Sequence, residues 1–222
     1  MSEYKLGYKR VKGKYSKREF LLPAFDKEEE FLKEVEIRYP LLRIFLDIKK
    51  FVEKENIHLF LRRCEEKALK EMIKENQVDE KKIRFSILEC PENLVKKCEC
   101  KYYGIEMKKE FPEDYRLWEE EFLRCIKCTG CIENCPVCFC EKCILFDEFY
   151  VKKGEIPPEF PIFHLIKVFH MAGRCVECNL CFELCPALLP INYLTRKINK
   201  FVKDNFGYEA GSEEINPLFK KP

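Results

Sequence analysis

Cysteine is the residue type whose spacing in this sequence points most directly to chemistry. The chain of 222 residues contains 15 cysteines. Eight of them form two copies of C-x2-C-x2-C-x3-C followed by proline: Cys125, Cys128, Cys131 and Cys135 before Pro136, and Cys175, Cys178, Cys181 and Cys185 before Pro186. In this pattern three thiolates hold one iron–sulfur cubane, and the fourth reaches the cluster of the other copy. The sequence therefore predicts two [4Fe–4S] clusters that exchange ligands.

The exchange defines two ligand sets. We predict that Cys125, Cys128, Cys131 and Cys185 hold one cluster, and that Cys175, Cys178, Cys181 and Cys135 hold the second. Because thiolates fill all of these positions, no iron is left open to a substrate, and we expect electron relay rather than catalysis. Zinc is the alternative occupant, although its sites usually pair two C-x2-C knuckles without a remote fourth ligand.

Seven cysteines lie outside the two motifs. We predict a third metal site from Cys138, Cys140 and Cys143 with one of Cys90, Cys98 or Cys100, occupied by a third [4Fe–4S] cluster. Two alternatives stay open: zinc at Cys98, Cys100, Cys140 and Cys143, or free thiols next to the other clusters.

The remaining candidate ligands have simpler interpretations. Cys64 lies within a helical pattern and is predicted to be a small buried residue rather than a ligand. The three histidines, His58, His164 and His170, lie in apolar stretches, where a packed or hydrogen-bonded ring is the commoner state. We predict no metal ligand among the histidines.

Composition narrows the class of protein. Lys and Arg number 41 and Asp and Glu 39, so the formal charge of +2 argues against a nucleic-acid partner. The sequence shows no signal peptide and no apolar run long enough to cross a membrane, so we expect a cytoplasmic protein whose cysteines bind metal rather than form disulfides. The many Lys and Glu residues and the single Gln are typical of thermophile proteins.

Several elements must position these cysteines. Helical patterns run over residues 26–40, 41–55 and 112–124, and a closing helix is expected between Pro190 and Gly207. Strands at 57–61 and 83–89 flank a helix at 62–78, which predicts a βαβ unit with parallel strands. Residues 1–20, rich in Lys, Arg and Tyr, are predicted to form a solvated or hairpin-like arm, with a specific docking arm as the alternative.

These elements predict an α+β fold. Residues 1–110 are expected to form an α/β scaffold and docking region that contains the βαβ unit. Residues 111–207 are expected to form a mainly helical, bacterial-ferredoxin-like dicluster domain with a cysteine-rich insertion. Residues 208–222 are predicted to be an extended polar tail.

Three segments of the sequence resemble a known family. Residues 60–78, followed by a strand that ends at Cys90-Pro91, resemble the beta subunits of deazaflavin-linked hydrogenases and formate dehydrogenases. Residues 124–143 and 163–194 are similar to the dicluster halves of formate dehydrogenase beta subunits and of iron–sulfur subunits associated with heterodisulfide reductases. The resemblance covers about residues 57–200 and implies that the eight motif cysteines are cluster ligands.

The resemblance implies a non-catalytic electron-transfer subunit of a multi-subunit anaerobic oxidoreductase complex, with other redox subunits as its partners. Some family members also bind a flavin, but this chain has no G-x-G-x-x-G phosphate loop. A flavin-dependent subunit that acts on a small electron carrier is one alternative function. A zinc-stabilised interaction scaffold is the other.

Overall fold

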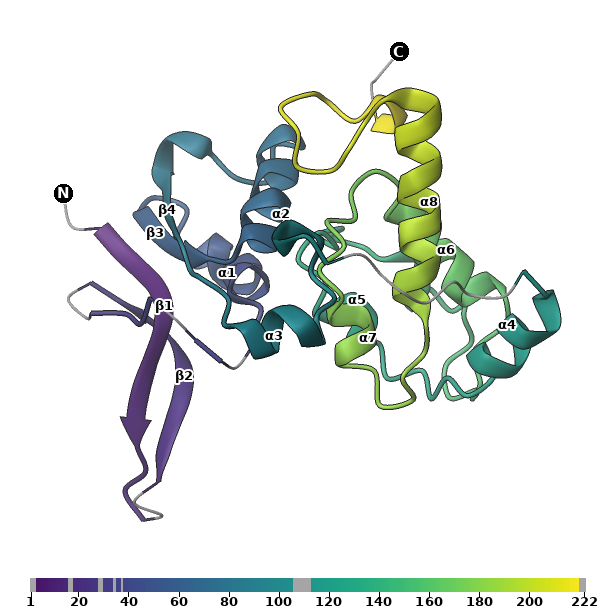
Figure 1. Cartoon of the computed structure of the whole chain (residues 1–222), viewed down its shortest axis with the longest axis horizontal. Coiled ribbons are helices and arrows are strands. Elements are labelled where there is room, and N and C mark those ends of the chain that lie inside the picture. The colour runs from purple at the N-terminus through teal and green to yellow at the C-terminus, as the bar shows by residue number, and fades with distance from the viewer. Residues whose placement is uncertain are drawn as a thin grey trace.

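The computed structural model describes residues 3–15, 18–27, 30–33, 35–36, 38–105 and 113–219 (Figure 1). The fold is α+β, with one four-stranded mixed sheet and eight α-helices in the described residues. In Figure 1 the sheet with α1 and α2 lies on one side of the molecule, and both cysteine motifs with α8 lie on the other. The expected boundary between residues 110 and 111 lies outside the described residues.

The sheet has the strand order β2-β1-β3-β4. Strands β1 (Glu3–Lys12) and β2 (Glu19–Asp26) pair antiparallel and extend away from the body as a hairpin (Figure 1), which confirms the hairpin-like arm. Strand β3 (Asn56–Leu61) pairs parallel with β1 and with β4 (Ile83–Ile87). The parallel βαβ pairing expected from the sequence is therefore confirmed.

The helical prediction for residues 26–40 is wrong for the described residues, which contain no helix in that range. Asp26 ends β2, where it pairs with Lys5 of β1, and the Leu32 amide donates a hydrogen bond to the Tyr8 carbonyl oxygen at 2.9 Å. Pairing with β1 thus outweighs the local helix propensity of the acidic run.

Helices α1 (Leu41–Ile48) and α2 (Arg63–Lys74) pack against β3. A short 3-10 turn, Lys49–Phe51, follows α1, so helical structure ends before the expected residue 55. The carboxylate of Glu65 accepts hydrogen bonds from the amides of Arg62 and Leu42, both at 3.1 Å, and so fixes the first turn of α2 against α1. Alternate residues of β3 are buried, which places the core of this half between the sheet and the two helices.

After 3-10 turn Glu80–Lys82 and strand β4, helix α3 (Glu92–Lys97) and 3-10 turn Lys101–Tyr103 complete this half. The second half contains α4 (Tyr115–Phe122), α5 (Gly130–Glu133), 3-10 turn Ile144–Phe146, α6 (Ile162–His170), α7 (Leu180–Glu183) and α8 (Ile191–Phe206). Helix α4 is shorter than the predicted helix at 112–124, whose first residue lies outside the described residues. Helix α8 packs on α6 and α7 and ends at Gly207, whose φ of +65° closes it. The closing helix is therefore confirmed.

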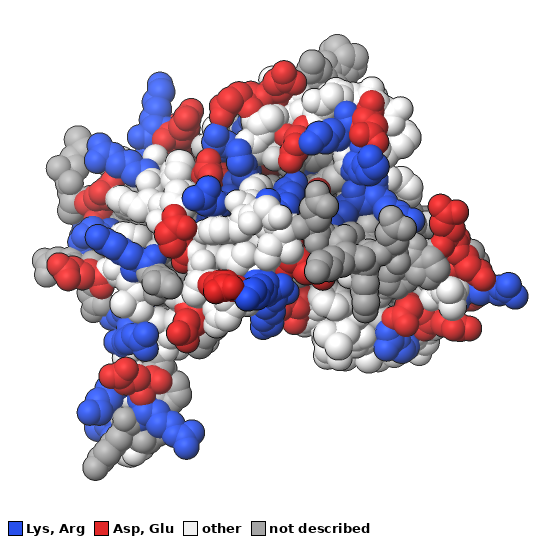
Figure 2. Space-filling model, viewed as in Figure 1, with Lys and Arg blue, Asp and Glu red and all other residues white. Residues whose placement is uncertain are grey.

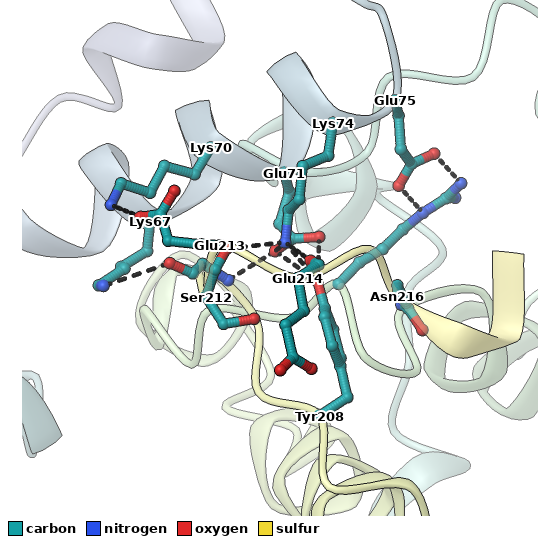
Figure 3. A network of polar contacts seen from close by, with 12 residues as sticks. Lys67, Lys70, Glu71, Lys74, Glu75, Tyr208, Ser212, Glu213, Glu214 and Asn216 are labelled. Carbon is teal, nitrogen blue, oxygen red and sulfur yellow. Dashed lines mark hydrogen bonds and ion pairs between the residues drawn. The ribbon is translucent and has the colours of Figure 1, made fainter. Parts of the chain in front are cut away.

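The C-terminal segment differs from the predicted extended polar tail. Tyr208 and Ala210 are buried, and Pro217–Phe219 forms a 3-10 turn. Figure 3 shows the segment directed at α2, where the carboxylate of Glu71, 1% exposed, accepts hydrogen bonds from the Tyr208 hydroxyl at 2.9 Å and the Gly211 amide at 2.5 Å. Sequence polarity missed this contact because a buried carboxylate of α2 supplies the partner for polar groups of the tail.

The surface carries intermixed charge. On the face shown in Figure 2, acidic and basic side chains alternate without a broad region of one sign, in agreement with the near-zero formal charge. None of the helices in the described part of the chain has the length and apolar content needed to cross a bilayer.

Candidate metal centre

The two cysteine motifs adopt the same backbone conformation. The second residue after the first cysteine has a φ of +54° at Lys127 and +53° at Glu177. The residue after the second cysteine has a φ of +58° at Thr129 and +66° at Asn179. Left-handed conformations are uncommon for residues other than glycine, so their repetition at matching positions shows that the sequence duplication is also a structural one.

The turned loops direct backbone amides at the cysteine sulfurs. Lys127 N lies 3.4 Å from Cys125 Sγ, and Glu177 N lies 3.4 Å from Cys175 Sγ. Hydrogen bonds of this kind stabilise a thiolate, the form of cysteine that binds metal. The loops are thus organised around sulfur atoms.

The fourth cysteine of each motif follows a one-turn helix. Cys135 follows α5 and Cys185 follows α7, and each amide donates a hydrogen bond to the carbonyl oxygen three residues earlier, at 3.2 Å from Ile132 and 3.1 Å from Phe182. Because α5 and α7 pack against each other, each fourth cysteine is carried toward the opposite motif.

The side-chain packing follows this exchange. Cys125, Cys131 and Cys185 lie in one apolar cluster built around Phe122 and Ile191, which Cys181 also contacts. The main core contacts a different group of motif cysteines: Cys135, Cys175 and Cys178. Each fourth cysteine therefore packs with cysteines of the other motif, as the predicted ligand sets require.

The electrostatic neighbours of the thiols lead to the same grouping. Burial raises the pKa of Cys131 to about 12, and the nearby thiols of Cys125, Cys128 and Cys185 add to the rise. For Cys181, burial raises the pKa well above its ordinary value, and the thiols that add to the rise are Cys175, Cys178 and Cys135. Both sets of four are close enough to interact by charge.

Lys167 of α6 is a buried cation among these thiols. Its side chain is 3% exposed, and its Nζ has no hydrogen-bond partner in the described residues. Burial by itself would lower the pKa of Lys167, but the thiolates of Cys135, Cys138 and Cys131 outweigh it and raise the pKa. A buried ammonium group needs an anionic partner. Thiolate-ligated iron–sulfur clusters would supply negative charge at this position, so the residues present fit the predicted clusters.

The ring of His164 is packed and that of His58 is hydrogen-bonded, as expected, whereas His170 is exposed. Both ring nitrogens of His164 are buried without a hydrogen-bond partner among the described residues, and burial lowers its pKa to about 4. The ring packs against Phe122 with centroids 4.4 Å apart. His58 instead shares a hydrogen bond of 2.8 Å with Ser86.

The seven other cysteines fall into two groups that differ from the predicted third site. Cys138 lies close to Cys135, Cys140 and Cys143. The cavity that contains the second group is lined by Cys64, Cys90, Cys98 and Cys100, and by none of the first three. Cys64 is buried, as predicted, and it also lines this cavity. The sequence did contain a signal for this position, because Cys64 comes shortly after β3 just as Cys90 comes shortly after β4.

Among the described residues, no three Cys, His, Asp or Glu side chains gather closely enough to hold a single metal ion. The zinc set Cys98, Cys100, Cys140 and Cys143 is thus not assembled as a tetrahedral site. Tetrahedral zinc would need all four donors within about 2.0–2.3 Å of one point.

Sequence comparison gives this geometry a context. No protein-family model matches the chain. The F420-dependent formate dehydrogenase subunit beta of Methanocaldococcus jannaschii is 34% identical over 148 residues, which are 66% of this chain. The F420-dependent formate dehydrogenase 1 subunit beta of Methanococcus maripaludis is 33% identical over 100 residues, which are 45% of this chain.

The matched part of the chain is homologous to the beta subunits of F420-linked formate dehydrogenases. The family resemblance expected from the sequence is confirmed. The matched regions span 38% of the M. jannaschii beta subunit and 26% of the M. maripaludis one. The chain thus shares a portion of these longer beta subunits.

Proposed function

We propose that this chain is an iron–sulfur electron-transfer subunit of a multi-subunit oxidoreductase complex of the formate dehydrogenase type. The observation that carries the proposal is the packing of each fourth cysteine with cysteines of the other motif, in two loops that place left-handed residues at matching positions. Homology to the F420-linked beta subunits supports an oxidoreductase complex. The names of those relatives favour formate dehydrogenase over the hydrogenase and heterodisulfide-reductase types.

The proposed ligand sets are those predicted from the sequence. Cys125, Cys128, Cys131 and Cys185 would hold one [4Fe–4S] cluster. Cys175, Cys178, Cys181 and Cys135 would hold the other. When bound, these clusters supply reversible electron storage at potentials that depend on charge, hydrogen bonds and solvent exposure.

The residues of the chain would control that storage in three ways. The amides of Lys127 and Glu177 donate toward the first sulfur of each motif, which favours the thiolate form. Apolar side chains such as Phe122 and Met171 exclude water from the thiols. The ammonium group of Lys167 lies beside thiols of both sets and favours the more negative, reduced state of each.

Residues 111–207 would form the dicluster domain, and residues 1–110 would serve as scaffold and docking region. With electrons entering and leaving through other redox subunits, the chain itself would perform no catalysis. We place the complex in the cytoplasm of an anaerobic, thermophilic organism. The deazaflavin carrier F420, which the names of both relatives contain, is a candidate electron partner of the complex.

The test is iron, acid-labile sulfide and zinc analysis of the anaerobically purified chain, together with low-temperature EPR after reduction. Wild-type protein should contain at least about eight irons and eight sulfides per chain. Cys185→Ala should selectively disturb the cluster of the first motif, and Cys135→Ala that of the second. Zinc without iron would support the interaction scaffold instead, and bound flavin with turnover of a carrier would support the flavin enzyme.

A further inference from the structure

The two cysteine motifs share one loop conformation, but their surroundings differ. Val176, which follows the first cysteine of the second motif, is 1% exposed, whereas Ile126 at the matching position of the first motif is 49% exposed. The second cysteine shows the same contrast, because Cys128 is exposed and Cys178 is partly buried. The structural duplication is thus broken by what covers each motif.

The first half of the molecule covers the second motif by binding its backbone. The Tyr102 hydroxyl donates a hydrogen bond to the Val176 carbonyl oxygen at 2.8 Å. The guanidinium of Arg38 donates to the carbonyl oxygen of Cys178. In the first motif, the matching carbonyl oxygen of Cys128 instead accepts from the hydroxyl of the next residue in the chain, at 2.7 Å. The loop that the first half holds in the second motif is therefore held only locally in the first.

Ion pairs complete the cover on the second motif. Arg174, just before this motif, donates from its Nε to the carboxylate of Glu75 at the end of α2, at 2.6 Å. Glu183 of α7 pairs with Arg38 at 3.1 Å and with Lys97 at 2.7 Å. The side chains of Arg174 and Glu183 are each only 13% exposed. One cation and one anion of the second motif thus meet opposite charges from the first half.

The first motif carries the same two charges, and both are open. Arg124 precedes this motif and Glu133 ends α5, at the positions of the two charges just described. Arg124 is 53% exposed and pairs with Glu121 of α4, which lies at the opposite end of the molecule from the hairpin of β1 and β2 (Figure 1). Glu133 is exposed and accepts a hydrogen bond from the Thr129 hydroxyl at 2.8 Å. No cation pairs with Glu133 within the part of the chain that the structure describes.

We propose that this open face, formed by Arg124, Ile126, Cys128 and Glu133, docks a second redox subunit, an inference that rests on the proposed relay function. The first half shows the chemistry that such a partner needs: a carboxylate for Arg124, a cation for Glu133 and apolar side chains over Ile126. Complementary charges of this kind select a partner and fix its orientation, and burial of Ile126 adds stability. Because Cys128 is a proposed ligand, the partner would contact the first cluster directly.

The test measures binding of the full chain to the formate-oxidising subunit, because the proposed complex is of the formate dehydrogenase type. Both proteins are purified anaerobically, and Kd is measured by isothermal titration calorimetry. The variants are Ile126→Asp and the charge-swapped double variant Arg124→Glu/Glu133→Lys. The double variant keeps the net charge of the chain, so overall charge cannot explain a loss of affinity. We expect Kd to rise at least about tenfold in both variants.

The matched control swaps an exposed ion pair elsewhere. Lys200 and Asp204 of α8 pair at 3.1 Å, with side chains 77% and 55% exposed, and they line a pocket with Glu177 of the second motif. Lys200→Glu/Asp204→Lys also keeps the net charge and should bind with the wild-type Kd. A loss of affinity equal to that of the other double variant would overturn the proposed face.

The outcomes separate the docking face from the relay itself. Iron content and EPR of each variant are first compared with wild type, so that a lost cluster is not mistaken for lost docking. Unchanged Kd in both face variants, or no binding of the formate-oxidising subunit to an iron-loaded wild-type chain, would overturn the face and leave the relay intact. A wild-type chain without iron would overturn the relay. If the double variant loses iron, Arg124→Gln/Glu133→Gln replaces it, and an unchanged Kd in that variant would also overturn the face.

Discussion

Replacing Lys167 with methionine should lower the reduction potential of both proposed motif clusters. Methionine keeps a similar volume but removes the one positive charge of this side chain, which lies beside Cys131, Cys135 and Cys181. A positive charge stabilises the reduced, more negative cluster, so its loss makes reduction harder.

The size of the shift follows from Coulomb's law. A unit charge about 8 Å from a cluster, in a medium of effective dielectric constant about 20, contributes about 2 kcal/mol. For a one-electron couple, for which about 1.4 kcal/mol corresponds to about 59 mV, this gives a decrease on the order of 80 mV.

The assay is an anaerobic redox titration followed by EPR, on variants first shown to retain the wild-type iron content. Lys167→Arg, which keeps the charge, should stay close to wild type. Lys153→Met is the control, because Lys153 also lies between the two cysteine motifs but its side chain is 80% exposed. Potentials in Lys167→Met equal to those in Lys153→Met would refute the assignment of Lys167 to the cluster environment.

Three further predictions concern stability. Burial holds the pKa of His164 at about 4, below the unfolded value near 6.5. The free energy of unfolding should therefore fall by about 2 kcal/mol between pH 7 and pH 5. Denaturant unfolding at both pH values should show this loss, and a His164→Phe variant that keeps the full loss would contradict it. Glu71→Ala removes the buried carboxylate that forms an ion pair with the partly buried Lys74 at 2.6 Å. It should lower the free energy of unfolding by about 3 kcal/mol or more in urea, whereas an effect below about 1 kcal/mol would show that the contact contributes little. Gly211→Ala places a Cβ 2.4 Å from Lys67 Cδ at a φ of +80°. It should lower the free energy of unfolding by about 1–3 kcal/mol and make the C-terminal segment more susceptible to limited proteolysis. Unchanged proteolysis would contradict this.

The parts of the fold that the sequence could predict are those fixed by local patterns. Alternating apolar residues identified β3 and β4, and Pro190 with Gly207 set the ends of α8. The duplicated cysteine spacing also predicted that each fourth cysteine packs with the other motif, because the fourth cysteine follows a one-turn helix whose direction depends on local geometry.

The parts that sequence patterns could not give depend on distant partners. Residues 19–26 became a strand because β1 pairs with them, although the acidic run that follows favours a helix. The tail packs because Glu71 supplies a buried acceptor. Cys64 and Cys90 line one cavity only through the parallel register of two strands, since they are 26 positions apart in the sequence.

The contact between Glu71 and the C-terminal segment also constrains the order of events during synthesis. Helix α2 leaves the ribosome long before Tyr208 and Gly211, so the carboxylate of Glu71 has neither of these donors until residues 208–211 have emerged. By then both cysteine motifs have also left the ribosome. The first half of the molecule thus reaches its final packing only after the motif cysteines of the second half are available, which would couple completion of the scaffold to the stage at which the proposed clusters are inserted.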